Sequence, residues 1–149
     1  MKNNAKQERH KKGEDEYKSY AYYAKAVREG NVHAFDDLDD DQKLESFLEK
    51  SLANASSKED DDEEDERSFI HVAAANGHGD LLELFLNTSI MKQKGGEFLE
   101  HPEKGDWAGT PLHSATAGGH MSTVSILLAA GANANAKTRG RDLTALHYA

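Results

Sequence analysis

The 149-residue sequence contains no cysteine, only two prolines and a single tryptophan. Without cysteine the chain can form neither disulfides nor thiolate metal sites, which is typical of proteins in a reducing compartment. The first residues are polar and charged and have no apolar core, so they do not form a usual secretory signal. No apolar run approaches the length that a membrane span needs. We therefore expect a soluble, cytoplasmic protein that does not enter a membrane.

Catalytic motifs are also missing. The sequence has no G-x-S-x-G nucleophile elbow, and its glycine pairs fit neither a dinucleotide-binding nor a phosphate-binding loop. The acidic run Asp37-x-Asp39-x-Asp41 departs from a calcium loop, since Gln42 takes the glycine position and Leu48 the glutamate position. The eight histidines show no known ligand spacing. We therefore predict no enzymatic activity, no cofactor, and no catalytic or metal site.

The formal net charge of −9 argues against nucleic acid as a partner, because phosphate binding needs a basic surface. The charge is compatible with basic proteins or peptides as partners. It is also compatible with the simpler interpretation that the charge only keeps the chain in solution.

A pattern typical of paired helices runs from Thr110 to Asn135. Thr110 can cap a helix because its hydroxyl can accept a free backbone N–H, and Pro111 suits the first helical position. The pair Gly118–Gly119 ends this helix, since glycine adopts the left-handed conformation without steric cost. A second helix follows and ends at Gly131. Its predicted apolar face consists of Val124, Leu127 and Leu128.

The pattern recurs along the chain, and the spacing from His71 to His78 equals that from His113 to His120. Thr-Pro-Leu-His-x-Ala at 110–115 is the signature of the ankyrin repeat, so the chain resembles an ankyrin-repeat protein. The best match is Thr110–Asn135, followed by Ser68–Asn87, a partial copy at Thr144–Ala149 and a degenerate first repeat at about Tyr20–Leu38. The resemblance implies an all-α helical solenoid with short β-hairpin or turn connections. It also implies that the Thr-Pro-Leu-His histidine hydrogen-bonds across the turn.

The remaining segments are predicted around these repeats. The interval from His71 to His113 exceeds the 33-residue family period by about nine residues, which predicts a long inserted loop broken by Gly95-Gly96 and Pro102. Phe98 and Leu99 are expected to hold this loop against the helices. The predicted divisions are a flexible basic tail (1–13), N-terminal helices with a degenerate capping repeat (14–55), an acidic disordered linker (56–67) containing Glu59–Glu66, and ankyrin repeats (68–149), with the insertion at 88–105 and the last repeat incomplete.

The resemblance implies a module that binds a protein partner through its hairpin tips and its concave helix face. Trp107 is the strongest candidate, because a tryptophan offers a large anchor at low entropic cost, with packing under the inserted loop as the alternative. The candidate partner-binding residues are Asn76, Asp106, Trp107, Ala117, Lys137, Arg139 and Arg141.

Two alternatives accompany this prediction. In the first, the array is the regulatory or targeting N-terminal part of a larger enzyme, or of a bacterial effector in the host cytoplasm, with its chemistry beyond residue 149. In the second, the chain is an inhibitor that uses its acidic run to cover a basic surface. Self-association through the open C-terminal repeat is a further expectation.

Overall fold

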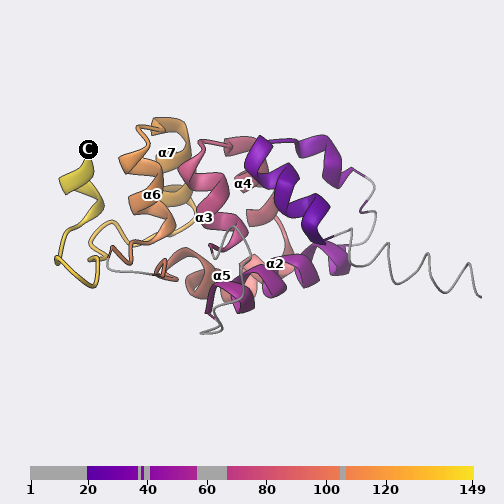
Figure 1. Cartoon of the computed structure of the whole chain (residues 1–149), viewed down its shortest axis with the longest axis horizontal. Helices are drawn as coiled ribbons and strands as arrows, with labels where there is room; N and C mark the ends of the chain where they lie inside the picture. Colours follow the sequence, from indigo (N-terminus) through magenta and orange to yellow (C-terminus); the bar gives the residue numbers. More distant parts are fainter. Residues whose placement is uncertain (1–19, 37, 39–40, 57–66, 105–106) are drawn as a thin grey trace, which may run out of the picture.

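The computed structural model describes residues 20–36, 38, 41–56, 67–104 and 107–149 (Figure 1). The predicted basic tail, the acidic run Glu59–Glu66 and the candidate Asp106 lie outside these residues. Over the described part of the chain the structure contains helices and turns and no strand. The predicted all-α helical repeat fold is therefore confirmed, and its connections are turns.

The repeats stack as pairs of short helices. The first helices α3 and α6 lie side by side, and the second helices α4 and α7 pack against each other in a neighbouring layer (Figure 1). A helix over residues 20–29 and the short 3₁₀ helix η1 precede them, and a second 3₁₀ helix, η2, packs on α6 at the C-terminal end. Their bounds are η1 Val32–Phe35, α3 Phe69–Ala75, α4 Gly79–Leu86, α6 Pro111–Ala117, α7 Met121–Ala129 and η2 Ala145–Tyr148.

The turn between the paired helices has the same geometry in three repeats. Gly30, Gly77 and Gly119 have φ values of 72°, 73° and 74°, in the left-handed region that glycine adopts without strain. The residue after each glycine donates its backbone N–H to an alanine carbonyl near the end of the preceding helix, at 2.9 to 3.0 Å. Residues 20–35 thus form a turn equivalent to those of the later repeats. Of the pair Gly118–Gly119, only Gly119 is left-handed, since Gly118 has a φ of −76°.

The core is continuous but uneven. Around α4, Leu81, Leu82 and Phe85 are fully buried. In α7, by contrast, the predicted apolar face is partly wrong, because Leu128 is 43% exposed whereas Thr123 is fully buried beside Leu127.

The inserted segment is the main departure from the sequence prediction. In place of a long loop, the helix α5 (Ser89–Leu99) forms, with a kink at Lys94 (φ −121°, ψ 19°) just before Gly95 and Gly96. Two glycines cost a helix about 2 kcal/mol relative to alanine. Burial on both sides of the kink outweighs this cost, since Ile90, Met91, Phe98 and Leu99 all enter the core. The predicted anchoring by Phe98 and Leu99 is therefore confirmed.

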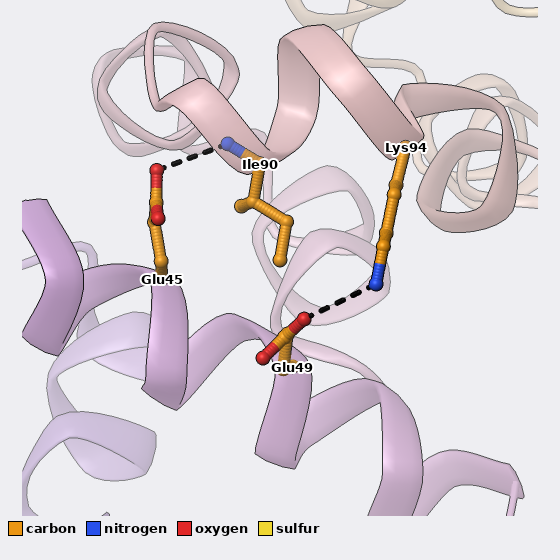
Figure 2. A network of polar contacts seen from close by, with 4 residues as sticks. All are labelled: Glu45, Glu49, Ile90 and Lys94. Carbon is orange, nitrogen blue, oxygen red and sulfur yellow. Dashed lines mark hydrogen bonds and ion pairs between the residues drawn. The ribbon is translucent and has the colours of Figure 1, made fainter.

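The N-terminal helices predicted over residues 14–55 include α2 (Asp41–Ser56), which packs directly on α5. Glu45 accepts a hydrogen bond at 3.0 Å from the backbone N–H of Ile90, a group at the start of α5 that has no intrahelical partner (Figure 2). One turn further along, Lys94 and Glu49 form an ion pair at 3.4 Å (Figure 2). Two inserted segments thus support each other against the repeats.

These two helices lie at the edge of the array where the first helices begin. The backbone N–H of Phe69, the first residue of α3, lies 3.3 Å from the hydroxyl of Ser51 on α2. The connections that enter α6 and η2 lie along the same edge (Figure 1). Over the first two repeats this edge is therefore covered by helices, and over the last two it consists of turns.

Candidate partner-binding surface

A histidine-centred cap fixes the start of α6. The backbone N–H of Thr110 donates to Nδ1 of His113 at 3.1 Å, and the Thr110 hydroxyl accepts from the backbone N–H of His113. Because Nδ1 accepts a hydrogen bond, the proton of the neutral ring resides on Nε2, which donates to the carbonyl of Leu143 at 3.0 Å. The imidazole therefore joins its own helix start to the connection entering the next repeat. The bond across the turn that the family resemblance implied is present.

The same cap occurs at the start of η2. Thr144 and His147 form the reciprocal pair, with the backbone N–H of Thr144 3.0 Å from Nδ1 of His147. Capping groups that satisfy free backbone donors in this way each contribute about 1 kcal/mol. The last partial copy of the motif therefore has a defined local structure.

The second repeat has a variant of this cap with a buried imidazole. His71 is completely buried, and its Nδ1 lies 2.7 Å from the hydroxyl of Ser68. Its Nε2 makes no hydrogen bond of normal geometry within the described residues. The pKa of His71 is lowered to about 3, mainly by burial and also by the neighbouring His101 ring, while hydrogen bonds to the backbone of Gly109 and His101 act in the opposite direction. His71 is thus a neutral core residue at physiological pH.

The histidine that follows the turn glycine in the second and third repeats joins neighbouring repeats. Nε2 of His78 donates to the carbonyl of Arg28 at 2.9 Å, and Nε2 of His120 donates to that of Ala75 at 3.0 Å. Each ring lies directly over a left-handed glycine of the preceding repeat, where a Cβ on Gly77 would approach Nδ1 of His120 to 2.5 Å. The turn glycines therefore serve both their own turn and the docking of the next repeat.

The turn that enters η2 carries three of the predicted site residues on a closed backbone loop. The backbone N–H of Thr138 donates to the carbonyl of Leu143 at 2.9 Å, and the Thr138 hydroxyl accepts from the N–H of Leu143 at 3.2 Å. Thr138 is buried, whereas Lys137, Arg139 and Arg141 are exposed. Sequence analysis did not single out Thr138, because it lies outside the Thr-Pro-Leu-His motif. We call this turn, residues 137–142, the basic turn.

Trp107 lies on the connection into α6 and contacts His113, whose imidazole bonds to the carbonyl of Leu143, the residue that follows the basic turn. Its indole N–H donates to the Tyr148 hydroxyl at 2.8 Å, and its ring meets the rings of Tyr148 and His113 edge-on. Trp107 is half-buried. Phe98 and Leu99, the residues expected to cover it, belong instead to the core cluster. Trp107 thus links the third repeat to the fourth and keeps part of its surface in solvent.

The other two candidates lie at the opposite ends of the first helices. Asn76 follows the last residue of α3, and Ala117 is the last residue of α6; both are exposed. The side chain of Asn76 donates to the carbonyl of Val72 at 3.0 Å. Because a seven-residue helix is about 10 Å long, these residues are roughly one helix length from the turns. The structure therefore separates the candidates into a turn group and a helix-end group.

Charge is distributed unequally between these regions. From Trp107 to Ala149 the only residues of the Asp, Glu, Lys and Arg types are Lys137, Arg139, Arg141 and Asp142, all in the basic turn. The positive charge of Arg139 acts on the nearby His101, whose pKa is lowered mainly by burial and further by this arginine. None of the three cations forms a salt bridge with a residue that the structure describes.

Across the described ranges, no cluster of three or more histidine, aspartate or glutamate side chains is arranged to hold a metal ion. None of the helices there has the length and apolar composition to cross a membrane.

Comparison with known families agrees with the geometry. A family model of ankyrin repeats matches residues 24–138 with three copies. The match includes the degenerate first repeat and the inserted helices, and it covers most of the chain. The chain therefore belongs to the ankyrin-repeat family, whose members are generally protein–protein interaction modules. A comparison with curated proteins finds no match.

Proposed function

We propose that this chain binds a partner protein through the basic turn and Trp107, with Asn76 and Ala117 at the margin of the contact. The observation that carries the proposal is the grouping of Lys137, Arg139 and Arg141, exposed and without described ion-pair partners, on a turn closed by Thr138. A preorganised turn loses little conformational entropy on binding, which favours affinity.

The half-buried Trp107 adds an aromatic surface next to these cations. Tryptophan and arginine are the residue types most enriched among those that dominate binding energy. Since the indole N–H is already bonded to Tyr148, the exposed part of the ring is available for apolar contact without leaving a polar group unsatisfied. Asp106, the remaining candidate, lies outside the described residues and stays a prediction.

The proposal can be tested by affinity capture from cell lysate with the parent chain and its Trp107→Ala/Arg139→Ala variant. The partner should be retained by the parent and lost by the variant. The matched control is Lys43→Ala/Lys92→Ala, which removes two exposed cations from α2 and α5 and should retain the partner. Circular dichroism and the melting temperature must show that all three proteins are folded. Identical protein sets from the parent and the folded turn variant would contradict the proposal.

Three other roles stay predictions of the sequence. They are a part of a larger enzyme or effector, an inhibitor that acts through the acidic run, and self-association. Of these, self-association has a specific structural correlate: Leu146 in η2 is 81% exposed, whereas the equivalent Leu112 in α6 is 2% exposed. Leu112 belongs to the core cluster, and its helix α6 packs against α3, α7 and η2, whereas the main contact of η2 is with α6.

A further inference from the structure

We propose that the partner segment received by the basic turn is acidic: a stretch of protein chain rich in aspartate and glutamate. This inference rests on the proposed function and specifies its partner. The net charge of −9 is by itself compatible with basic partners, and the inference departs from that expectation. The structure changes the expectation because the charge is not spread evenly over the folded repeats.

The residues that the structure describes are formally neutral. They contain eleven lysines and arginines and eleven aspartates and glutamates, so the entire net charge of −9 belongs to the other residues of the sequence. Within the described part, residues 20–104 carry a small acidic excess and residues 107–149 a basic one. At physiological ionic strength charges further apart than about 8 Å are largely screened. A ligand at the basic turn therefore responds to the local cations more than to the net charge.

Among the described residues, the two carboxylates that precede the connection into α6 each accept a hydrogen bond from a neutral donor, while Asp106 lies outside the described residues. Glu100 accepts a hydrogen bond at 2.7 Å from the backbone N–H of Asn133, and Glu103 accepts one at 3.0 Å from the hydroxyl of Ser114. Both bonds hold a connection in place. The positive charge of the turn is thus compensated within it only by Asp142, which follows directly after Arg141 and leaves an excess of two positive charges.

The backbone of the turn is fixed on both sides. Before it, the N–H of Asn135 bonds to the side-chain oxygen of Asn133 at 3.0 Å, and within it the N–H of Asp142 bonds to the carbonyl of Thr138 at 3.1 Å. Arg139 and Arg141 therefore project from a defined base. The planar guanidinium groups can each bind a carboxylate through two parallel hydrogen bonds, which lysine cannot do.

A protein segment fits this surface better than nucleic acid does. Typical nucleic-acid sites neutralise six to ten phosphates, about two to three times the number of cations in the turn. The adjacent Trp107–Tyr148 pair also offers an apolar aromatic edge, which suits the side chains that accompany carboxylates in a peptide.

The inserted helices restrict the site to the C-terminal half. α2 and α5 cover the corresponding edge of the first two repeats, and their exposed charges are of both signs: Lys43, Glu49, Lys50, Lys92, Lys94 and Glu97. One of these cations, Lys94, is paired with Glu49. Among the described residues, the basic turn brings three exposed cations into five consecutive positions, 137–141, and an acidic segment therefore meets a denser group of cations there than on α2 or α5.

The direct test uses a fluorescent peptide of eight glutamates, titrated into the full chain at low and physiological salt. Binding should weaken as salt rises and should weaken about tenfold or more in Lys137→Gln/Arg139→Gln/Arg141→Gln, because each exposed ion pair contributes only a few-fold. The matched control Lys25→Gln/Lys43→Gln/Lys92→Gln removes the same charge from the N-terminal half and should change the affinity less than twofold. No binding to the parent, or an equal loss in both variants, would overturn the inference.

Two further arms separate this inference from the proposed function. A partner captured through the turn should be displaced by the octaglutamate peptide and not by octalysine. If the partner resists octaglutamate, the inference fails and the proposed function stands; if the peptide binds the turn but no turn-dependent partner exists, the proposed function alone fails. The acidic-protein assignment would also be overturned if single-stranded DNA or phosphatidylserine vesicles displaced the partner at a lower concentration than octaglutamate does.

Discussion

In the N-terminal half of the array, α4 is surrounded by aromatic and aliphatic side chains, and Phe85 meets the ring of Phe35 edge-on at a centroid distance of 5.5 Å. In the C-terminal half, α7 buries only Thr123 and Leu127, and much of the order comes from polar groups such as His113 and Thr138. Both halves nevertheless use the same left-handed glycine turn.

The comparison shows that one repeat geometry can be stabilised in two ways. Where the inserted helices α2 and α5 add apolar surface, the repeats bury a thick core that includes Leu48, Phe69 and Phe98. Where no helix is inserted, the edge consists of turns, which bury little apolar surface and expose charged side chains. We call residues 20–104 the thick half and residues 107–149 the thin half. The thick half buries more apolar surface, and the thin half carries the contact that we propose for a partner.

The largest expected effect comes from Phe85→Ala in the thick half. Removing a fully buried phenylalanine creates a cavity beside Phe35 and Phe69 and should lower the free energy of unfolding by about 3–5 kcal/mol. Urea denaturation followed by circular dichroism measures the change. The control Leu128→Ala in the thin half, at a position that is 43% exposed, should cost less than about 1 kcal/mol. Similar losses for the two variants would refute the contrast between the halves.

A second comparison concerns the shared turn, through Gly77→Ala and Gly119→Ala. Both substitutions place an alanine at a φ near +73°, which costs about 1–2 kcal/mol. A Cβ at Gly77 also meets the ring of His120 at 2.5 Å, whereas nothing lies within 4 Å of one at Gly119. Displacing that ring breaks its bond to Ala75, so Gly77→Ala should cost about 1 kcal/mol more in the same urea assay. Equal costs would mean that inter-repeat docking does not depend on this close approach.

The third prediction concerns pH and the buried His71. Its folded pKa of about 3 lies below the unfolded value of 6.5, so the unfolded state binds a proton that the folded state does not. Stability is therefore fully present above pH 6.5 and falls as the pH decreases toward 3, by about 1.4 kcal/mol per pH unit. Between pH 7 and pH 5 we expect a loss of about 2 kcal/mol from this residue.

The variant His71→Gln tests the assignment, because glutamine can keep a hydrogen bond to the Ser68 hydroxyl but does not titrate. Its melting temperature should fall less steeply between pH 7 and pH 5 than that of the parent. His147→Gln makes the same change in the exposed copy of the cap and controls for the substitution itself. An unchanged acid slope in His71→Gln would exclude the buried imidazole as its source.

The smallest effect is expected for the ion pair between the inserted helices. Lys94 and Glu49 have half-exposed side chains, and such a pair contributes at most about 0.5 kcal/mol. Lys94→Ala should therefore barely change the urea midpoint at physiological salt. Ile90→Ala in the same helix removes a buried side chain and should cost about 2–4 kcal/mol. If Lys94→Ala were the more harmful of the two, the α2–α5 contact would depend on charge and not on burial.

Sequence reasoning located the repeats because their signals are local. Thr110 and Pro111 define a helix start, and the turn glycines define a helix end, through backbone constraints that neighbouring residues alone impose. The same reasoning failed for α5, because Gly95 and Gly96 have low helix propensity and only burial of the flanking apolar residues compensates for it.

The candidate site was predictable in composition but not in arrangement. The family resemblance indicated Trp107 and the cations of the basic turn, yet the bond from Trp107 to Tyr148 joins residues from different repeats and has no local signature. The lowered pKa of His71 was likewise invisible in the sequence, since it depends on burial and on His101 from a distant segment.

The sequence by itself determined the class of fold, the positions of the left-handed turns and the histidine caps, because each depends on interactions within a few residues. Only the tertiary structure decided that the two inserted segments pair as helices over one edge of the first two repeats. The same edge of the last two repeats is left as turns, among them the exposed basic turn. That outcome depends on which apolar surfaces meet, and the free energy of such contacts is determined by the packed arrangement of the whole array.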